Sequence, residues 1–194
     1  WGRGGGTGNI GKSPFAYKTA DGLVPFDEFV KYNTGQPNSI GTPLKPSTVV
    51  GHEGEYVTNV STGFTRRASV NSHDWYGAVV NFNTQLTKNL ILDFGVDART
   101  YVGYHFRNIN DRLGADVYFD NKDINNPNRY LYGTYSATPS FNPWTDVKSQ
   151  EKIEYNNNGY VKWYGAFTQL EYSNDNLSAF FQGAISQQGF QRED

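Results

Sequence analysis

The stretch that decides the fold runs from residue 74 to residue 106 and reads DWYGAVVNFNTQLTKNLILDFGVDARTYVGYHF. Side chains alternate between the two faces of a β-strand. Residues 74–86 and 90–106 each gather apolar side chains on one face under this alternation. The three residues between them, TKN at 87–89, are typical of a short hairpin turn. The stretch therefore predicts two long antiparallel strands.

The register of this hairpin follows from its apolar positions. Pairing Leu86 with Leu90 places Phe82 opposite Phe94, so both apolar faces lie on one side of the sheet. That apolar face comprises Tyr76, Ala78, Val80, Phe82, Thr84 and Leu86 on the first strand, and Leu90, Leu92, Phe94, Val96, Ala98, Thr100, Val102, Tyr104 and Phe106 on the second.

A second hairpin repeats the pattern at residues 162–186, which read KWYGAFTQLEY, SNDN and LSAFFQGAIS. The tetrapeptide WYGA at 75–78 recurs at 163–166. Alternation gives this hairpin an apolar face too, comprising Tyr164, Ala166, Thr168, Leu170 and Tyr172, then Leu177, Ala179, Phe181, Gly183 and Ile185. The first 54 residues are loop-rich, short strands are expected at 56–60 and 64–70, and a long polar connection spans 107–158.

An amphipathic sheet has to place its apolar face against a second sheet or against lipid. Lipid is favoured by the 17-residue run 90–106, since ordinary strands have about 5–6 residues. The short turns TKN and SNDN alternate with one long connection, which is the layout of outer-membrane barrels. We therefore predict an all-β fold, an antiparallel transmembrane β-barrel segment with long extracellular loops. A secreted, soluble β-sandwich that binds glycans remains the open alternative.

Composition limits the other classes of function. The net charge of −2 provides no basic field for nucleic acid, and no cysteine is present for disulfides or thiolate metal sites. No apolar run reaches the 18 residues of a membrane helix. Methionine is also absent, so we expect a mature chain or a fragment.

Residues 6–13, GTGNIGKS, match the phosphate-binding loop pattern of nucleotide hydrolases. That loop needs a buried strand before it and a helix after it. Only WGRGG precedes Gly6, and Pro14 follows Ser13 in a segment without helical apolar spacing. We therefore interpret the match as a polar loop, and the NTPase becomes a third, less favoured hypothesis.

The stretches SVNSHDWYGAVVNFNTQLTKNLILDFGVDARTYVGYHFR and GYVKWYGAFTQLEYSNDNLSAFFQGAISQQGF, with the opening GRGGGTG, resemble the barrel of a TonB-dependent outer-membrane receptor of Bacteroidetes type. Within that family the resemblance extends to receptors with a carboxypeptidase-like regulatory domain and to the SusC-like branch. It covers most of residues 60–190 and the first dozen, and no catalytic motif carries it.

The resemblance implies a 22-strand barrel closed by a plug and driven by TonB–ExbB–ExbD, of which residues 1–194 form part of one domain. We expect the plug and the TonB box outside this chain. The implied function is energised uptake of a glycan, peptide or chelate across the outer membrane of a Gram-negative cell. The implied partners are the rest of the barrel and plug, outer-membrane lipid and a surface lipoprotein, with no nucleic acid. The resemblance implies no enzymatic activity, cofactor or metal.

The polar face of the first hairpin carries the predicted lumen-facing residues Asp93, Asp97, Arg99 and His105. We expect the charged ones to brace the wall through salt bridges. Asp93 and Asp97 are about 13 Å apart along a strand, too far to share a glycosidic bond. A His73–His105 metal site would need a third ligand that the sequence does not obviously supply.

The polar connection is the best candidate for ligand contact because loops longer than about 12–15 residues are usually functional or disordered. Its aromatic side chains could stack on sugars or peptides, or pack the connection against itself. The predicted ligand-contacting residues are Tyr118, Tyr130, Tyr132, Tyr135, Phe141 and Trp144. Asp120, Asp123 and Asn125 offer oxygen ligands for calcium, but they lack the glycine and the closing glutamate of a calcium loop.

Overall fold

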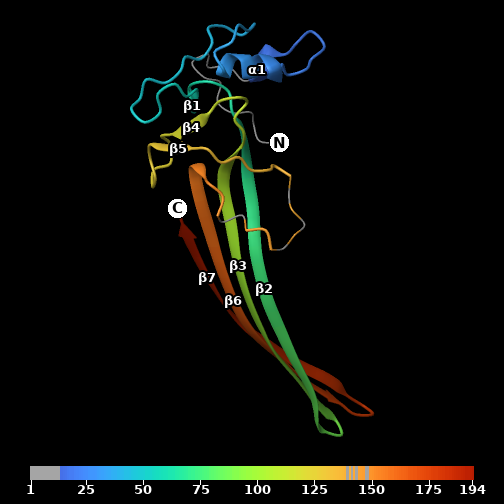
Figure 1. Cartoon of the computed structure of the whole chain (residues 1–194). Coiled ribbons are helices and arrows are strands. Elements are labelled where there is room, and N and C mark those ends of the chain that lie inside the picture. The colour runs from blue at the N-terminus through green and yellow to red at the C-terminus, as the bar shows by residue number, and fades with distance from the viewer. Residues whose placement is uncertain (1–13, 139, 141, 143, 147–148) are drawn as a thin grey trace. The chain divides into compact units, whose positions relative to one another are not determined.

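Four long strands form the larger of two sheets in the computed structural model (Figure 1). The structure describes residues 14–138, 140, 142, 144–146 and 149–194. The strand order is β2 (Arg66–Thr87), β3 (Leu90–Asp111), β6 (Ile153–Ser173) and β7 (Ser178–Glu193). The smaller sheet has the order β1 (Val57–Thr58), β4 (Val117–Asp120) and β5 (Arg129–Leu131), with β1 parallel to β4. The predicted all-β character is therefore confirmed, and the strands are mostly antiparallel.

The chain divides into two compact units. The hairpin unit contains residues 72–104 and 157–193. The loop unit contains the described residues up to Asn71, residues 105–156 and Asp194. The boundaries of the units fall within β2, β3 and β6, so these three strands contribute residues to both.

Both predicted hairpins are present in the hairpin unit. β6 and β7 pair in one unbroken antiparallel register from Asn158–Glu193 to Ser173–Ser178, which includes Leu170 opposite Phe181. In the first hairpin, Asn83 Nδ2 donates to Asp93 Oδ1 at 2.6 Å, which fits the pairing of Leu86 with Leu90 because that register places Asn83 opposite Asp93. The two hairpin turns lie together, since Ser173 N donates to Asn89 O at 2.9 Å (Figure 1).

The strands are longer than the sequence predicted. β2 and β3 have 22 residues each, and the expected separate strand at 64–70 is the beginning of β2. The polar connection is shorter and more ordered than expected. β3 continues to Asp111, β6 begins at Ile153, and β4 and β5 lie between them.

The main difference from the prediction is the helix α1 (Phe26–Asn33) within the supposedly loop-rich first 54 residues. Its sequence, FDEFVKYN, places acidic residues in the first turn and a lysine in the last, which suits the helix dipole. Lys31 Nζ contacts Glu28 Oε1 at 2.6 Å. A four-residue 3₁₀ helix, η1 (Pro14–Tyr17), follows the phosphate-loop match, which itself lies outside the described residues.

Two hydrophobic clusters form the core of the loop unit. In the first, Phe29 of α1 stacks on Phe64 with ring centroids 4.2 Å apart, and Tyr32 and Leu113 complete the buried set. The second cluster joins β3, β4, β5 and β6 through Ile109, Tyr118, Leu131 and Ile153. These contacts show why a helix forms here: α1 buries one face against the loops.

A close approach between β3 and β6 gives the first testable prediction. The ring of Phe167 lies where a Cβ atom on Gly95 would be, so Gly95→Ala forces the ring to move. We expect this overpacking to lower the free energy of unfolding by about 1–3 kcal/mol. Urea unfolding followed by circular dichroism measures it. Gly159→Ala is the control, because nothing lies within 4 Å of a Cβ there; equal stability of the two variants would contradict the prediction.

Candidate functional site

The small sheet separates two groups of side chains in the loop unit. The β4–β5 register pairs Phe119 with Tyr130, and it pairs Tyr118 with Leu131 and Asp120 with Arg129. Because side chains alternate along a strand, the Phe119–Tyr130 pair lies on one face and the other two pairs lie on the opposite face. The first face carries an aromatic and polar cluster at the surface, while the second carries a buried charged network.

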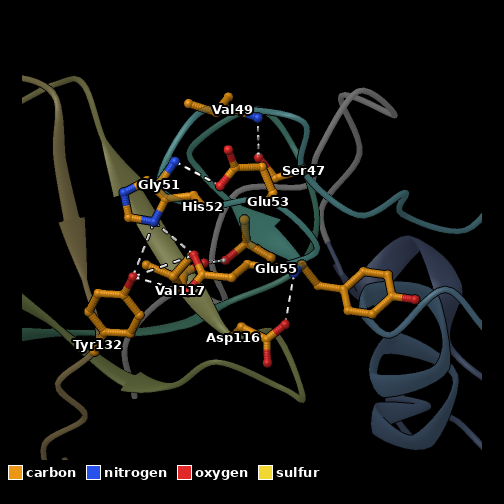
Figure 2. A network of polar contacts seen from close by, with 11 residues as sticks. Ser47, Val49, Gly51, His52, Glu53, Glu55, Asp116, Val117 and Tyr132 are labelled. Atoms are coloured by element: carbon orange, nitrogen blue, oxygen red, sulfur yellow. Dashed lines mark hydrogen bonds and ion pairs between the residues drawn. The ribbon is translucent and has the colours of Figure 1, made fainter.

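The surface cluster consists of His52, Glu55, Tyr130 and Tyr132. Figure 2 shows three of these residues, His52, Glu55 and Tyr132. His52 Nδ1 lies 2.8 Å from Glu55 Oε2 and 3.2 Å from the Tyr132 hydroxyl oxygen. Tyr132 in turn donates to Glu55 Oε1 at 3.2 Å. The His52 ring stacks on Tyr130 with centroids 3.5 Å apart and planes inclined by 16°. One carboxylate therefore orients both the imidazole and the phenol.

Turns in the preceding loop hold this surface cluster in place (Figure 2). Glu53 Oε2 accepts the backbone N–H of Gly51 at 2.8 Å, and His52 N donates to Val49 O at 2.9 Å. Asp116 Oδ2 accepts the N–H of Tyr56 at 2.8 Å, which fixes the strand entry directly after Glu55. The imidazole and the carboxylate therefore project from a loop that its own hydrogen bonds constrain.

The surface cluster is accessible to ligands. Tyr132 is about half exposed, at 48%. Desolvation, followed by the hydrogen bond to Glu55, raises the pKa of Tyr132 above its usual value, so the phenol stays a neutral donor at physiological pH. Aromatic rings beside a fixed carboxylate can bind a ligand by ring contact and by accepting hydrogen bonds from its hydroxyl or amide groups.

The buried network on the other face is built from acid–base pairs. Glu154 contacts both Arg67 and Arg107, and its backbone N–H donates to Asp120 Oδ2 at 3.0 Å. Glu154 adopts a φ of 64°, an uncommon conformation for a residue other than glycine. The contacts of both its side chain and its backbone hold this conformation in place.

The possible calcium ligands Asp120 and Asp123 converge on an arginine. Arg129 Nη2 lies 2.9 Å from Asp123 Oδ2 and 3.6 Å from Asp120 Oδ2, so a guanidinium provides the positive charge there. Asp123 Oδ1 accepts the backbone N–H groups of Asn125 and Asn126. Among the residues that the structure describes, no group of three or more His, Asp or Glu side chains could hold a metal ion.

The alkaline stability of the chain should report on Tyr118. Burial raises the pKa of Tyr118 to about 12, from the usual tyrosine value of about 10. A raised pKa means that the unfolded chain loses this proton first, so native stability falls between about pH 10 and pH 12. Tyr118→Phe should remove up to about 2–3 kcal/mol of that fall. Urea unfolding of the parent chain and of Tyr118→Phe at pH 9 and pH 11.5 tests this prediction. The same pH dependence of stability in both proteins would contradict it.

The structure places the predicted ligand-contacting residues in different environments. Tyr130 and Tyr132 meet in the surface cluster. Tyr118 is 1% exposed in the core, and the Tyr135 hydroxyl accepts the Glu151 N–H at 2.9 Å, so both pack the connection against itself. Trp144 is 89% exposed, and Phe141 lies outside the described residues.

The predicted lumen-facing residues make local polar contacts on their strands. Arg99 donates to both oxygens of Asp97, at 2.9 and 2.6 Å, and this ion pair lies within β3. Asp93 accepts from Asn83 instead. His105 Nδ1 lies 2.7 Å from Asn71 Oδ1, while His73 stacks on Tyr101, so each histidine has its own neighbour.

Sequence reasoning missed His52, Glu55 and the pairing of Glu154 with two arginines. His52 and Glu55 stand in HEGE, a glycine-rich turn without strand or helix periodicity. They meet Tyr132 across about 80 residues of sequence, and only the β1–β4–β5 sheet brings them together. The i, i+3 spacing of the histidine and the glutamate was the only local sign of their pairing.

No protein-family model, curated protein or solved structure matches the chain. The site is therefore interpreted from its own geometry. Within the described residues, no helix is both long enough and apolar enough to cross a membrane.

Proposed function

We propose that this chain is a segment of a TonB-dependent outer-membrane transporter, contributing barrel wall and a ligand-contacting loop unit. The observation that carries the proposal is the apolar face of the hairpin unit, which is uncharged and largely exposed. The part of that face formed by residues 76–86, 90–104, 164–172 and 177–185 contains no charged, amide or histidine side chain. Its polar groups there are threonine and tyrosine hydroxyls.

The exposure of this face is what a lipid-facing surface requires. Phe82 is 69% exposed, Phe181 is 71% and Ile185 is 76%. Exposed apolar patches of more than a few hundred Å² are rare on soluble monomers and mark contact surfaces. A strand needs about 9–11 residues to cross a bilayer, and the part of β6 from Tyr164 to Tyr172, which carries its one charge, Glu171, on the opposite face, is of this length.

The opposite face fits a water-filled interior. It carries the Asp97–Arg99 ion pair and the Asn83–Asp93 hydrogen bond in the middle of the strands. Aromatic side chains such as Trp75 and Phe180 share that face and are also exposed. Alternation of an apolar outer face with a mainly polar inner face is the pattern of membrane barrels.

The edges of the large sheet define the partners. β2 and β7 are its outer strands, and lipid does not tolerate unpaired backbone groups. We infer that neighbouring strands of the same barrel pair with both edges and that a plug closes the lumen. TonB–ExbB–ExbD would supply the energy, and a surface lipoprotein is a further partner. The loop unit would contact the ligand through Tyr130, Tyr132 and their neighbours, without catalytic chemistry.

The mass and location of the source polypeptide test the proposal. We expect antibodies against the chain to detect, in detergent extracts of outer membranes, a species several times heavier than 21.8 kDa. A soluble species of about this mass would overturn the transporter and favour the glycan-binding β-sandwich. The soluble fraction of the same cells is the matched comparison.

A further inference from the structure

A polar hollow of about 250 Å³ lies in the loop unit, on the side of β5 that carries Arg129. We call it the amide hollow. Its walls come from the connection after β4, the first residue of β5, the residues before β6 and β6 itself. The lining residues are Asp123, Asn125, Asn126, Arg129, Gln150, Glu151, Lys152 and Asn156.

The amide hollow is formally neutral. Asp123 and Glu151 balance Arg129 and Lys152, and the remaining four side chains are amides. Arg129 is already engaged, because Nη2 donates to Asp123 Oδ2 at 2.9 Å and to Lys152 O at 2.7 Å. A free anion or cation would compete with these internal pairs. A neutral ligand leaves them intact.

The walls of the amide hollow are held by hydrogen bonds that do not depend on a ligand. Arg129 Nε donates to Asn126 O at 2.9 Å, and Glu151 Oε2 accepts the N–H of Gly133 at 2.8 Å. The backbone next to the lining is also constrained, since Glu154 has a φ of 64° between Lys152 and Asn156. A preformed site loses less conformational entropy when a ligand binds.

Two buried amide oxygens, one on a lining residue of the amide hollow and one on a residue that contacts the lining, have no hydrogen-bond partner among the described residues. One is Oδ1 of Asn156, a lining residue. The other is Oδ1 of the fully buried Asn108, whose Nδ2 donates to the lining residue Gln150 at 2.7 Å. Buried polar atoms in native proteins are nearly always paired. Oδ1 of Asn156 is itself buried, so this side chain would have to turn before a hydroxyl donor in the amide hollow could pair with it.

We propose that the amide hollow binds one neutral, hydroxyl-rich unit, such as a single sugar ring. An amide side chain offers a hydrogen-bond donor and an acceptor together, and a sugar hydroxyl can both donate to and accept from such a side chain. The volume is below the roughly 300–1,000 Å³ of sites for drug-sized ligands, so it suits one small ring. The proposal deepens the proposed function, on which it rests for assigning the bound unit to the transported compound.

Binding of defined monosaccharides tests this site. The native polypeptide in detergent is titrated by calorimetry and by saturation-transfer NMR with glucose, galactose, mannose, xylose and N-acetylglucosamine, each alone. Glucuronate, glucosamine and the dipeptide Gly-Leu are the charged and peptide comparators. We expect at least one neutral sugar to bind and the comparators to bind at least tenfold more weakly.

Variants locate the binding. Asn125→Ala combined with Gln150→Ala should weaken the sugar by at least tenfold, while Asn176→Ala in the β6–β7 loop should leave it unchanged. Asn156→Asp, which adds a charge to the amide hollow, is an independent variant with the same expected loss. Circular dichroism confirms that each variant is folded.

The proposal is overturned if none of the five sugars binds, if a comparator binds best, or if the folded hollow variants bind as well as the control. Fractionation of the same cells reports separately on the transporter. A membrane-bound polypeptide that binds no sugar would reject the amide hollow alone, whereas a soluble one that binds sugar would reject the transporter alone.

Discussion

Replacing Glu154 by glutamine is expected to lower the free energy of unfolding by about 3–5 kcal/mol. The carboxylate is the shared partner of Arg67 and Arg107, and both the carboxylate and Arg67 are largely buried. Glutamine keeps the size and the strained backbone, so the variant removes only the charge. Two guanidinium groups would then lie close together without the carboxylate that pairs with both, and Asp120 would be the acidic group left near Arg67.

Urea unfolding followed by circular dichroism measures this effect. Glu53→Gln is the matched control, because Glu53 is exposed and its contact with the Gly51 N–H needs only an oxygen acceptor. We expect the control to stay within about 0.5 kcal/mol of the parent chain. A loss below 1 kcal/mol for Glu154→Gln would contradict the view that Glu154 is the buried counter-charge of Arg67 and Arg107.

Asn33→Asp should be the second most damaging substitution. Asn33 is fully buried at the end of α1, and its Nδ2 donates to the carbonyl oxygens of Phe64, Arg112 and Leu113. Its Oδ1 accepts the N–H of Phe64 at 2.9 Å. An aspartate has the same shape but directs a carboxylate at three carbonyl groups. We expect a loss of about 2–4 kcal/mol near neutral pH.

The sign of the pH dependence makes this prediction specific. The new carboxyl group would be favoured in its protonated form in the folded chain, so its folded pKa lies above its unfolded pKa. Stability of the variant relative to the parent therefore rises as the pH falls through the folded pKa. Asn38→Asp is the control, since Asn38 is only partly buried and its Oδ1 accepts two N–H groups that a carboxylate also accepts. A loss that does not change with pH would contradict the prediction.

The two hairpins of the large sheet could be predicted from the sequence because the alternation and the short turns that determine them are local features. Alternation in 74–106 and 162–186 specified the faces, and the short turns specified the pairing. The strand ends could not be predicted in the same way. Residues 66–73 and 153–161 lack clear alternation, and pairing with neighbouring strands extends the sheet through them.

The loop unit was largely beyond sequence reasoning because its order comes from long-range contacts. α1 has only eight residues, too short to be stable alone, and it forms where Phe29 can stack on Phe64. Tyr118 and Tyr132 look alike in the sequence. Only the β4–β5 register shows that Tyr118 faces the core, whereas Tyr132 reaches His52 and Glu55 at the surface.

The central claim is that the apolar face of the hairpin unit meets lipid while the opposite face meets water. The chain has no cysteine, so single cysteines can carry a nitroxide label without interference from its other residues. Phe82→Cys, Phe94→Cys and Phe181→Cys label the apolar face, and the adjacent Asn81→Cys, Asp93→Cys and Gln182→Cys label the other. The labels are read by electron paramagnetic resonance in the native polypeptide in membranes.

We predict that the first three labels relax preferentially with oxygen, which dissolves in lipid, and that the second three relax preferentially with a water-soluble nickel chelate. Such an alternation between neighbouring residues requires one face in lipid and one in water. Equal access of the nickel chelate to both sets of labels, or protection of the first set from both reagents, would contradict a lipid-facing sheet.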